Sequence, residues 1–411
     1  MVALKPALEI VVEDLQGSLW VAAIVRNKVT ALEIDPYLEL VRWGSIYWAR
    51  VLRIDTTINA AFVDLGHDMT GMLPASEIPG LQKGAKIGKK LKAGQFVMVQ
   101  VKTARQPEED DNGHDPRPDA VKASKVSMDI ALQGRYLIYT PKSPGNRISR
   151  RVREPNVRKQ LVAMSKAIKA INGCILRASA AHTQTEILER EAKIQRAIWE
   201  SLQTFTTETE PSLLMLGPDA LQRVLGDFAT SRMGTIQIST DERSEEAYNW
   251  CDLYAPELMQ KIESRAVTGT RTGMGLMEAR DLLGQIEDFV RPVVALPGGA
   301  SFVIEDSALG TMIDVNSGGA SLVQTNHDAA DEIARQIRLR NIGGIILIDF
   351  AGKPDGNENK RLTKQLQKAF DLDPCTVELH GVTRTGLFEI TRHRRTPTLA
   401  DRIELMQDDF E

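Results

Sequence analysis

Two apolar segments in the last third of the chain each end on an aspartate. The segment TMIDVN covers residues 311–316 and carries Asp314 and Asn316, and the segment GGIILIDF covers residues 343–350 and carries Asp349. Side chains alternate between the two faces of a β-strand, so Asp314 and Asn316 point to the same face. The sequence therefore places two carboxylates and an amide at strand ends, where they can act together on a ligand.

The residues between these segments predict a helix. Apolar residues recur there at helical spacing, which predicts a helix over 326–340, and Thr325 followed by Asp328 is typical of a capping box at its start. Strand, helix and strand within roughly 40 residues form a βαβ unit whose two strands run parallel. Open α/β sheets bind ligands at the carboxyl ends of such strands. The two aspartates and the asparagine are therefore expected to converge at one edge of a sheet.

Two carboxylates with a carbonyl oxygen suit a hard, oxygen-preferring cation such as Mg²⁺. A Mg²⁺ ion in such a site keeps several waters, an arrangement suited to activating one of them at a phosphodiester. The plainer alternative is that the carboxylates only end the strands and bind water. A lone strand-end aspartate favours that alternative, whereas the pair together with Asn316 favours a metal site.

The composition is that of an ordinary globular protein. The 411 residues are 42% hydrophobic and 26% charged, with a net charge of −4. Three cysteines (Cys174, Cys251 and Cys375) lie far apart without a C-x-x-C pair, which argues against a disulfide framework and a cysteine zinc site. The sequence shows neither a secretory leader nor a run of ~20 apolar residues, so we expect a cytoplasmic protein without a membrane span. The absence of G-x-x-x-x-G-K-[ST] argues against P-loop chemistry.

The pattern of short apolar segments indicates several domains. Three strands are expected within 7–34, and four within 44–104, where the spacing is typical of a small barrel. Helices are expected over 155–172 and 184–204. Strands and helices alternate over 290–395, which predicts a layered α/β sheet.

The chain as a whole resembles the RNase E/G family of bacterial endoribonucleases. The resemblance is strongest in TMIDVNSG…DEIARQIRLRNIGGIILIDF, and it continues in family order through INAAFVDLG…GMLPASEI, GRYLIYTP…ISRRV, KIE at 261–263, LPGGA at 296–300 and TRTGLFEITRHR at 383–394. It implies an endoribonuclease of RNA processing and decay that uses Mg²⁺, with Mn²⁺ as a substitute, to hydrolyse single-stranded RNA, leaving 5′-phosphate and 3′-hydroxyl ends. By this resemblance Asp314 and Asp349 are catalytic residues that bind the metal, and Asn316 positions the attacked phosphate.

The resemblance also implies a multidomain α/β fold. Residues 1–40 and 223–289 would form an RNase H-like domain, and residues 41–128 an inserted OB-type RNA-binding barrel of the ribosomal S1 kind. Residues 129–222 would form a 5′-sensor-like region, and residues 290–411 a DNase I-like catalytic region.

Several residues of the barrel are expected to contact RNA. From Gly80 to Arg105 there are seven lysines or arginines and no acidic residue, and such barrels hold single strands by base stacking beside a basic track. The aromatic pair Tyr47 and Trp48 is explained equally well as barrel core. Phe62 matches an RNA-contacting phenylalanine of the family, and Lys122 matches a phosphate-contacting lysine. A second family aromatic falls on Met72, a replacement that should weaken stacking.

The region from 134 to 178 resembles the family's sensor for an RNA 5′ monophosphate. Gly134, Ile138 and Arg177 fall at matching positions, and a planar guanidinium suits a phosphate. The family's threonine beside the arginine is Ala178 here, so one hydroxyl donor is missing and the preference for monophosphorylated ends is in question. Arginines at 384, 392, 394 and 395 would either line the groove leading to the metal or lie solvated on a strand's outer face.

The chain ends at Glu411 without the cysteine pair that shares zinc between subunits in longer family members, and without the small domain after it. We therefore expect no zinc and no zinc-linked tetramer, but a monomer or a dimer. One alternative function is a non-catalytic RNA-binding protein on a retained scaffold, favoured by Ala178 and Met72. A second alternative, a metal-dependent phosphatase of small nucleotides, needs neither the barrel nor the lysine-rich track.

Overall fold

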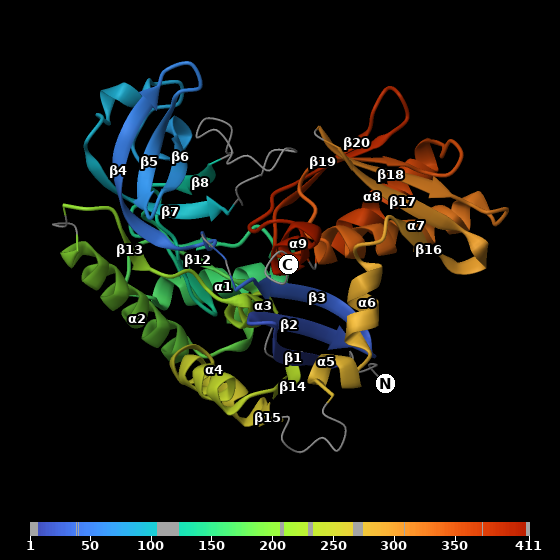
Figure 1. Cartoon of the computed structure of the whole chain (residues 1–411), viewed down its shortest axis with the longest axis horizontal. Coiled ribbons are helices and arrows are strands. Elements are labelled where there is room, and N and C mark those ends of the chain that lie inside the picture. The colour runs from blue at the N-terminus through green and yellow to red at the C-terminus, as the bar shows by residue number, and fades with distance from the viewer. Residues whose placement is uncertain are drawn as a thin grey trace. The chain divides into compact units, whose positions relative to one another are not determined.

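The computed structural model describes residues 7–37, 39, 41–104, 123–205, 209–228, 233–265, 274–307, 309–371 and 373–407 (Figure 1). The chain divides into two compact units, the first formed by Met1–Ile10 and Leu38–Ala266 and the second by Val11–Tyr37 and Val267–Glu411. Strand β1, Leu8–Leu15, begins in the first unit and ends in the second. None of the described helices is long and apolar enough to cross a membrane.

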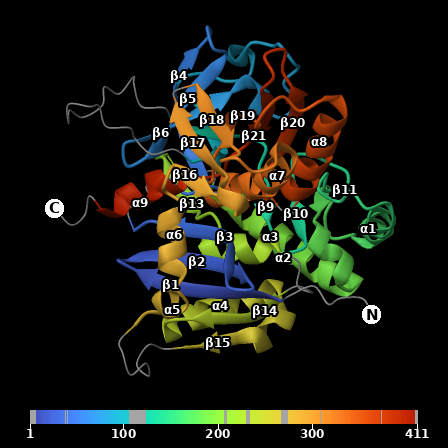
Figure 2. The same cartoon turned by 90° about the vertical axis from the view of Figure 1, so that its right-hand side faces the viewer.

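A closed five-stranded barrel forms one part of the first unit. Its strands are β4 (Ile46–Asp55), β5 (Ala60–Gly66), β6 (Met69–Pro74), β7 (Phe96–Thr103) and β8 (Ser124–Ser127); β4, β5 and β6 are labelled near the top of Figure 2. They follow the order β4-β5-β6-β8-β7, and an additional β4–β7 pairing closes the ring, while β13 (Ser212–Met215) extends it beyond β4. Every second residue of these strands points into the barrel, where Ala49, Val63, Val99 and Val126 are buried.

The described residues of the rest of the first unit form a small sheet and four α-helices. The sheet has the order β11-β12-β10-β9. Its strands are β9 (Leu132–Gln133), β10 (Leu137–Tyr139), β11 (Arg147–Ile148) and β12 (Cys174–Leu176). The helices are α1 (Pro155–Ala167), α2 (Thr185–Thr204), α3 (Ala220–Asp227) and α4 (Asp241–Tyr254), and β14 (Met233–Ile238) pairs in parallel with β15 (Ile262–Ser264). Leu137, Leu161 and Leu188 share one core that joins this sheet to α1 and α2.

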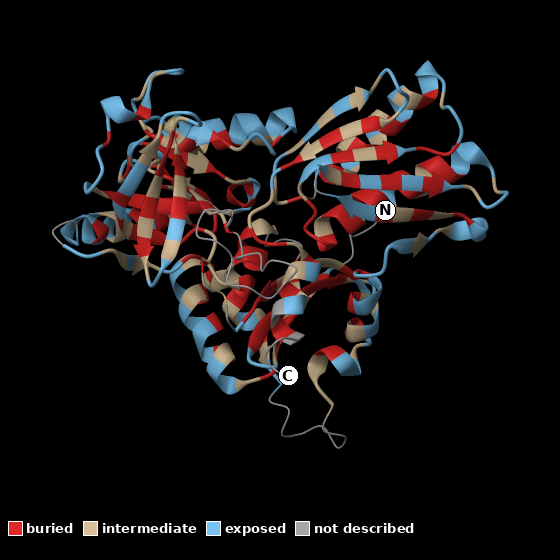
Figure 3. Ribbon diagram, turned by 45° about the horizontal axis from the view of Figure 1, so that its top comes forward, coloured by how far each residue is buried: buried red, intermediate tan, exposed pale blue. Residues whose placement is uncertain are grey.

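The second unit contains a six-stranded sheet of order β16-β17-β18-β19-β21-β20. Its strands are β16 (Val293–Ala295), β17 (Ser301–Ser307), β18 (Gly310–Asn316), β19 (Gly344–Asp349), β20 (Val377–Val382) and β21 (Phe388–Arg392). Helices α7 (Leu322–Leu339) and α8 (Gly356–Phe370) contribute Ile333, Ile337 and Leu366 to the core on one face of this sheet. Buried residues alternate with exposed or half-buried ones along the strands (Figure 3), as expected for a sheet with one face packed on a core.

The second unit also holds β2 (Ser18–Val25) and β3 (Lys28–Asp35), which pair antiparallel, and helices α5 (Leu276–Ala279), α6 (Leu282–Asp288) and α9 (Leu399–Gln407). The buried carboxylate of Glu13 accepts hydrogen bonds from the amides of Leu276 and Met277 at 2.9 and 2.8 Å. These contacts satisfy two amides at the start of α5 that have no partner within the helix.

The expected helices are present, with two differences in extent. Helix α2 matches the prediction, α1 ends at Ala167 rather than at 172, and α7 begins four residues earlier than expected. The prediction of Thr325 as N-cap was wrong: Ser321 takes that place, and Thr325 lies inside α7 with 2% of its surface exposed. Between Ser321 and Thr325 there is neither glycine nor proline, so nothing stops the helix from extending toward the glycine-rich loop.

Candidate active site and nucleic-acid interface

The two aspartates lie directly opposite each other on neighbouring strands. Strand β18 pairs in parallel with β19, and in this register Asp314 faces Asp349. Strand pairs lie about 4.8 Å apart, and opposed residues send their side chains to the same face of the sheet. Both aspartates are exposed, while Ile313 and Ile348 beside them are buried in the core. The predicted convergence of the two carboxylates is therefore what the register produces.

The asparagine also lies where the alternation rule places it. Asn316 is exposed on the same face, and its Nδ2 donates a hydrogen bond to Oδ2 of Asp314 at 2.8 Å. This contact uses the amide nitrogen of Asn316 and turns one oxygen of Asp314 toward it. Asn316 thus orients a carboxylate, a role the sequence did not reveal.

A buried contact after β19 holds Asp349 in place. Phe350 packs into the core against Phe388, with ring centroids 6.1 Å apart. The next residue, Ala351, forms two hydrogen bonds with the side chain of Asn326 on α7. Oδ1 of Asn326 accepts from the Ala351 amide at 2.9 Å, and Nδ2 of Asn326 donates to the Ala351 carbonyl at 3.0 Å. Asn326 is 2% exposed. The direction in which the chain leaves Asp349 is therefore set by a side chain of α7, which sequence reasoning missed.

The chemistry of these side chains fits a magnesium ion. Among the described residues no group of three or more His, Cys, Asp and Glu side chains gathers as a metal site. Magnesium does not need such a group, because it is usually held by one or two carboxylates together with waters and substrate phosphates. Asp314 and Asp349 supply two exposed carboxylates on one face, which suits that mode of binding.

The barrel residues divide between core and surface. Tyr47 is buried, so the core interpretation holds for it, and half-buried Trp48 stacks with Phe96 at a centroid distance of 5.9 Å. Phe62 on β5 and Met72 on β6 are direct cross-strand partners, both half-buried. Lys122 lies outside the described residues.

Of the predicted sensor residues, Ile138 lies on β10, Gly134 directly follows β9, and Arg177 and Ala178 directly follow β12. Ile138 pairs with Ile175, and Nη1 of Arg177 donates to the carbonyl of Gly134 at 3.2 Å, while Ala178 is exposed. The structure therefore brings Gly134 and Arg177 into contact. Nη2 of Arg177 donates to Oδ1 of Asp227, at the end of α3, at 2.8 Å. A phosphate here would share the guanidinium with this internal carboxylate.

A buried carboxyl lies behind the same turn. Glu191 of α2 is 1% exposed, and its two oxygens accept hydrogen bonds from the Tyr136 amide at 3.2 and 3.0 Å. Burial raises the pKa of Glu191 to about 8, against the opposing effect of these backbone hydrogen bonds. A Cβ at Gly134 would lie 1.9 Å from Oε1 of Glu191, so a residue without a side chain is required there.

One C-terminal arginine contradicts both interpretations made from the sequence. Arg392 neither lines a groove nor lies solvated: its side chain is 1% exposed and its Nε and Nη2 donate to Asp373 at 2.9 and 3.1 Å. Along β21 it alternates onto the inner face with Phe388 and Ile390. Arg384, by contrast, is exposed.

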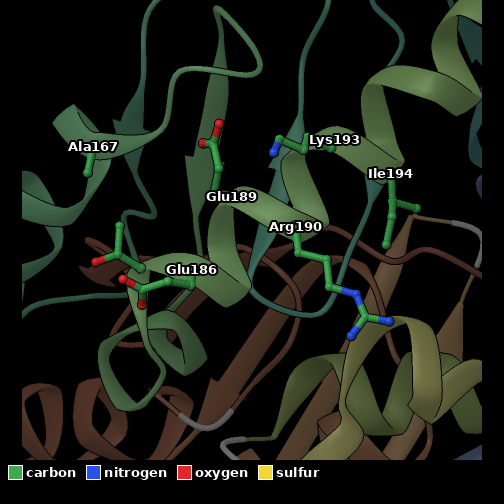
Figure 4. Close-up of a pocket in the computed structure, with 7 residues that line it drawn as sticks. Ala167, Glu186, Glu189, Arg190, Lys193 and Ile194 are labelled. Carbon is green, nitrogen blue, oxygen red and sulfur yellow. The ribbon is translucent and has the colours of Figure 1, made fainter.

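None of the candidate residues described above lines the pocket of about 540 Å³ that lies beside α2. It is lined by Ala167 at the end of α1 and by side chains of α2 between Thr185 and Ile194 (Figure 4). Its charged side chains are two acidic ones, Glu186 and Glu189, and two basic ones, Arg190 and Lys193. Such a lining has no excess of positive charge to recognise a phosphate.

The fold and the site together place a closed barrel and a sheet with paired carboxylates in one chain. The model of the family described as "Ribonuclease E/G family" matches residues 131–395, and the model described as "S1 RNA binding domain" matches residues 41–109. The first match covers more than half of the chain. The chain belongs to the Ribonuclease E/G family, and as a member of that family it is a ribonuclease with an S1 RNA-binding domain.

Individual relatives agree with this assignment. Ribonuclease G of Salmonella typhimurium is 28% identical over 372 residues, which cover 85% of this chain and 72% of the relative. Ribonuclease E of Synechocystis is 28% identical over 87% of this chain and 53% of the relative, and ribonuclease E of Haemophilus influenzae is 27% identical over 93% and 41%. The chain thus spans about half or less of the length of these two ribonuclease E proteins.

Proposed function

We propose that this protein is a Mg²⁺-dependent endoribonuclease that cuts single-stranded RNA during RNA processing and decay in the cytoplasm. The observation that carries the proposal is the register that sets Asp314 opposite Asp349, with Asn316 bonded to Asp314. Family membership and the S1 domain support RNA as the substrate. In the proposed reaction a water adds to the phosphorus and the bond to the 3′ oxygen breaks, leaving 5′-phosphate and 3′-hydroxyl ends.

Each side chain of the site has a distinct role in this proposal. Asp314 and Asp349 would hold the metal, and the chemistry that Mg²⁺ supplies when bound is polarisation of phosphate oxygens and of a coordinated water. Asn316 orients Asp314 through one N–H of its Nδ2, and the second N–H of the same amide would donate to the incoming phosphate. Because both aspartates are exposed at the end of their strands, an extended RNA backbone can approach them.

The finer parts of the proposal follow the family resemblance. We assign residues 1–40 and 223–289 to an RNase H-like domain, 41–128 to the RNA-binding barrel, 129–222 to the 5′ sensor and 290–411 to a DNase I-like region. Phe62, Met72 and Lys122 would contact RNA from the barrel, and Gly134, Ile138, Arg177 and Ala178 would form the sensor. A preference for 5′-monophosphate ends would be modest, because Arg177 already donates to Asp227.

The test is cleavage of a fluorescent A/U-rich single-stranded RNA in Mg²⁺ by the wild type, Asp314→Asn and Asp349→Asn. Each variant removes one charge at nearly constant volume. Glu305→Gln is the matched control, because Glu305 is exposed on β17 and faces Met312, on the same face of the sheet as Asp314. We expect internal cleavage by the wild type and the control, and loss of cleavage with retained RNA binding in the two asparagine variants.

The products and the metal complete the test. The new 5′ ends should accept exonuclease digestion that requires a 5′ phosphate, and activity should disappear with EDTA and return with Mg²⁺ or Mn²⁺. If the wild type binds RNA but never cuts it under any divalent metal, the nuclease proposal is wrong and a non-catalytic RNA-binding protein remains. Cleavage that survives both substitutions would remove the carboxylate pair from the mechanism.

A further inference from the structure

Four residues from four strands form a row on the outside of the barrel. Arg53 of β4 is the cross-strand partner of Phe62, Phe62 is the partner of Met72, and Met72 is the partner of Lys125 on β8. Cross-strand partners project from the same face of a sheet. The residues beside Phe62 in sequence, Ala61 and Val63, are fully buried in the barrel, so the row faces outward.

A β-bulge brings Arg53 into this row. The register of β4 against β5 shifts between Val51 and Arg53. Val51 points into the barrel core, and two residues further along a regular strand Arg53 would point inward as well. The extra residue of the bulge reverses that alternation and turns the arginine outward.

The guanidinium of Arg53 lies over the ring of Phe62. Its Cζ is 3.9 Å from the ring centroid, and 55% of the side chain is exposed. Asp55, with Oδ2 3.6 Å from Nη1, helps to hold it there. A nucleobase approaching Phe62 from this side therefore meets the flat, charged face of the guanidinium before it meets the ring. Arginine planes stack with unpaired bases, and they add a positive charge that the ring lacks.

The other end of the row carries a second cation. Nζ of Lys125 lies 2.7 Å from Oε1 of Glu77, with 39% of the lysine side chain exposed. Next to it, Met72 offers a flexible apolar surface, which adapts to a base without the geometry of an aromatic ring. Two cations thus flank an apolar centre. Arg53 offers a plane on which a base can stack, and Lys125 offers a charge for a backbone phosphate.

The basic segment of the barrel is held next to the start of β5, the strand that carries Phe62. Asn59 precedes β5 by one residue; its Nδ2 donates to the Ala85 carbonyl at 3.0 Å and its Oδ1 accepts from the Ile87 amide at 2.9 Å. This double contact fixes the segment that carries exposed Lys83, Lys86 and Lys89 beside the start of β5. Positive charge therefore continues from the row along the barrel, as a phosphate backbone requires.

We propose that Arg53, Phe62, Met72 and Lys125 form a contact site for one nucleotide of single-stranded RNA, in which the base stacks on the guanidinium of Arg53 and Lys125 holds a phosphate. The inference rests on the proposed function only in taking RNA as the ligand, and not on cleavage. It makes Arg53, rather than the Phe62 ring alone, the stacking surface, and so explains how the barrel keeps a stacking site although its second position is a methionine.

The test measures binding of a fluorescein-labelled 2′-O-methyl oligouridine decamer, which the enzyme cannot hydrolyse, by anisotropy in EDTA. We expect Arg53→Gln to weaken binding by about tenfold or more, and Arg53→Lys by at least about fivefold, because lysine keeps the charge but has no plane to stack on. Lys125→Gln should lower the slope of log affinity against log salt by about 0.7, as expected for one lost phosphate contact to a single strand.

The matched control is Arg50→Gln. Arg50 lies on the same strand, is 48% exposed in its side chain, and forms an exposed ion pair with Asp64 at 3.3 Å, so the charge change is the same outside the row. Binding by this variant should stay within about twofold of the wild type. The proposal is overturned if Arg53→Lys binds as the wild type does, or if Arg53→Gln and Arg50→Gln weaken binding equally. Failure of the proposed nuclease function would appear separately, as intact binding of the decamer with no cleavage of unmodified RNA.

Discussion

Replacing Glu191 by glutamine should remove a pH dependence of stability in the sensor-like region. Burial raises the pKa of Glu191 from 4.5 to about 8. A carboxyl whose pKa is higher in the folded than in the unfolded state favours folding fully below pH 4.5, and this contribution is lost as the pH rises through 8. At 1.36 kcal/mol per pH unit, the loss over that window is roughly 5 kcal/mol. Glutamine stays neutral, and its oxygen can still accept the Tyr136 amide.

The measurement is hydrogen-exchange mass spectrometry of the peptide containing Tyr136, at increasing urea and at pH 5, 6.5 and 8. The free energy of opening should fall steeply with pH in the wild type and stay nearly constant in Glu191→Gln, which becomes the more stable protein at pH 8. Glu200→Gln on the same helix is the control, because Glu200 is exposed and pairs with Arg196 at 2.7 Å. Parallel pH profiles for the wild type and Glu191→Gln would refute the reasoning that burial holds this carboxyl neutral.

Three further substitutions test other parts of the structure. Asn326→Ala should lower the free energy of unfolding in urea by about 1–3 kcal/mol, because it removes both hydrogen-bond partners of the buried Ala351 backbone. It should also weaken Mn²⁺ binding measured by electron paramagnetic resonance. An unchanged Mn²⁺ affinity would mean that this contact does not position Asp349. Asp373→Asn should cost about 3–5 kcal/mol in urea unfolding, because Arg392 keeps a fully buried charge without its carboxylate, and a loss below 1 kcal/mol would contradict a paired buried charge. Gly134→Ala should lower the melting temperature at pH 5 and pH 8 alike, because the added methyl group would clash with the buried Glu191 carboxyl in either protonation state. A melting temperature equal to that of the wild type would contradict the close approach of Gly134 to Glu191.

The carboxylate pair was predictable because local rules determine it. Alternation along a strand put Asp314 and Asn316 on one face, and a short βαβ unit made the strands of Asp314 and Asp349 parallel neighbours, as the structure confirms. Arg392 was misread although a signal existed: it lies two and four residues after Ile390 and Phe388, the spacing of one strand face. Arginine is rarely buried in a core, so the residue type argued for an exposed position although the strand spacing indicated a buried one.

Other features have no local signal. Strand β8, which completes the barrel, is only four residues long and follows a polar segment. It is too short to show the alternation of apolar and polar residues that predicts a strand. Helix α7 begins earlier than the sequence predicted, because no residue between Ser321 and Thr325 ends a helix. Thr325 itself is buried inside the helix, and such packing supplies most of the stability of a helix in a protein. Nothing in the sequence distinguishes Asn326 from other polar residues, because its hydrogen-bond partner Ala351 lies in a different segment of the chain.

By itself, the sequence determined the mixed α/β content, the pairing of Asp314 with Asp349 and the presence of an RNA-binding barrel, because these depend on spacing along one chain segment or on a family pattern. Only the tertiary structure decided which cations meet which apolar groups. Arg53 reaches Phe62 through a bulge, and Lys125 reaches Met72 through a strand that arrives about fifty residues later. Such contacts join residues distant in sequence, and their energy depends on closure of the barrel rather than on any local preference.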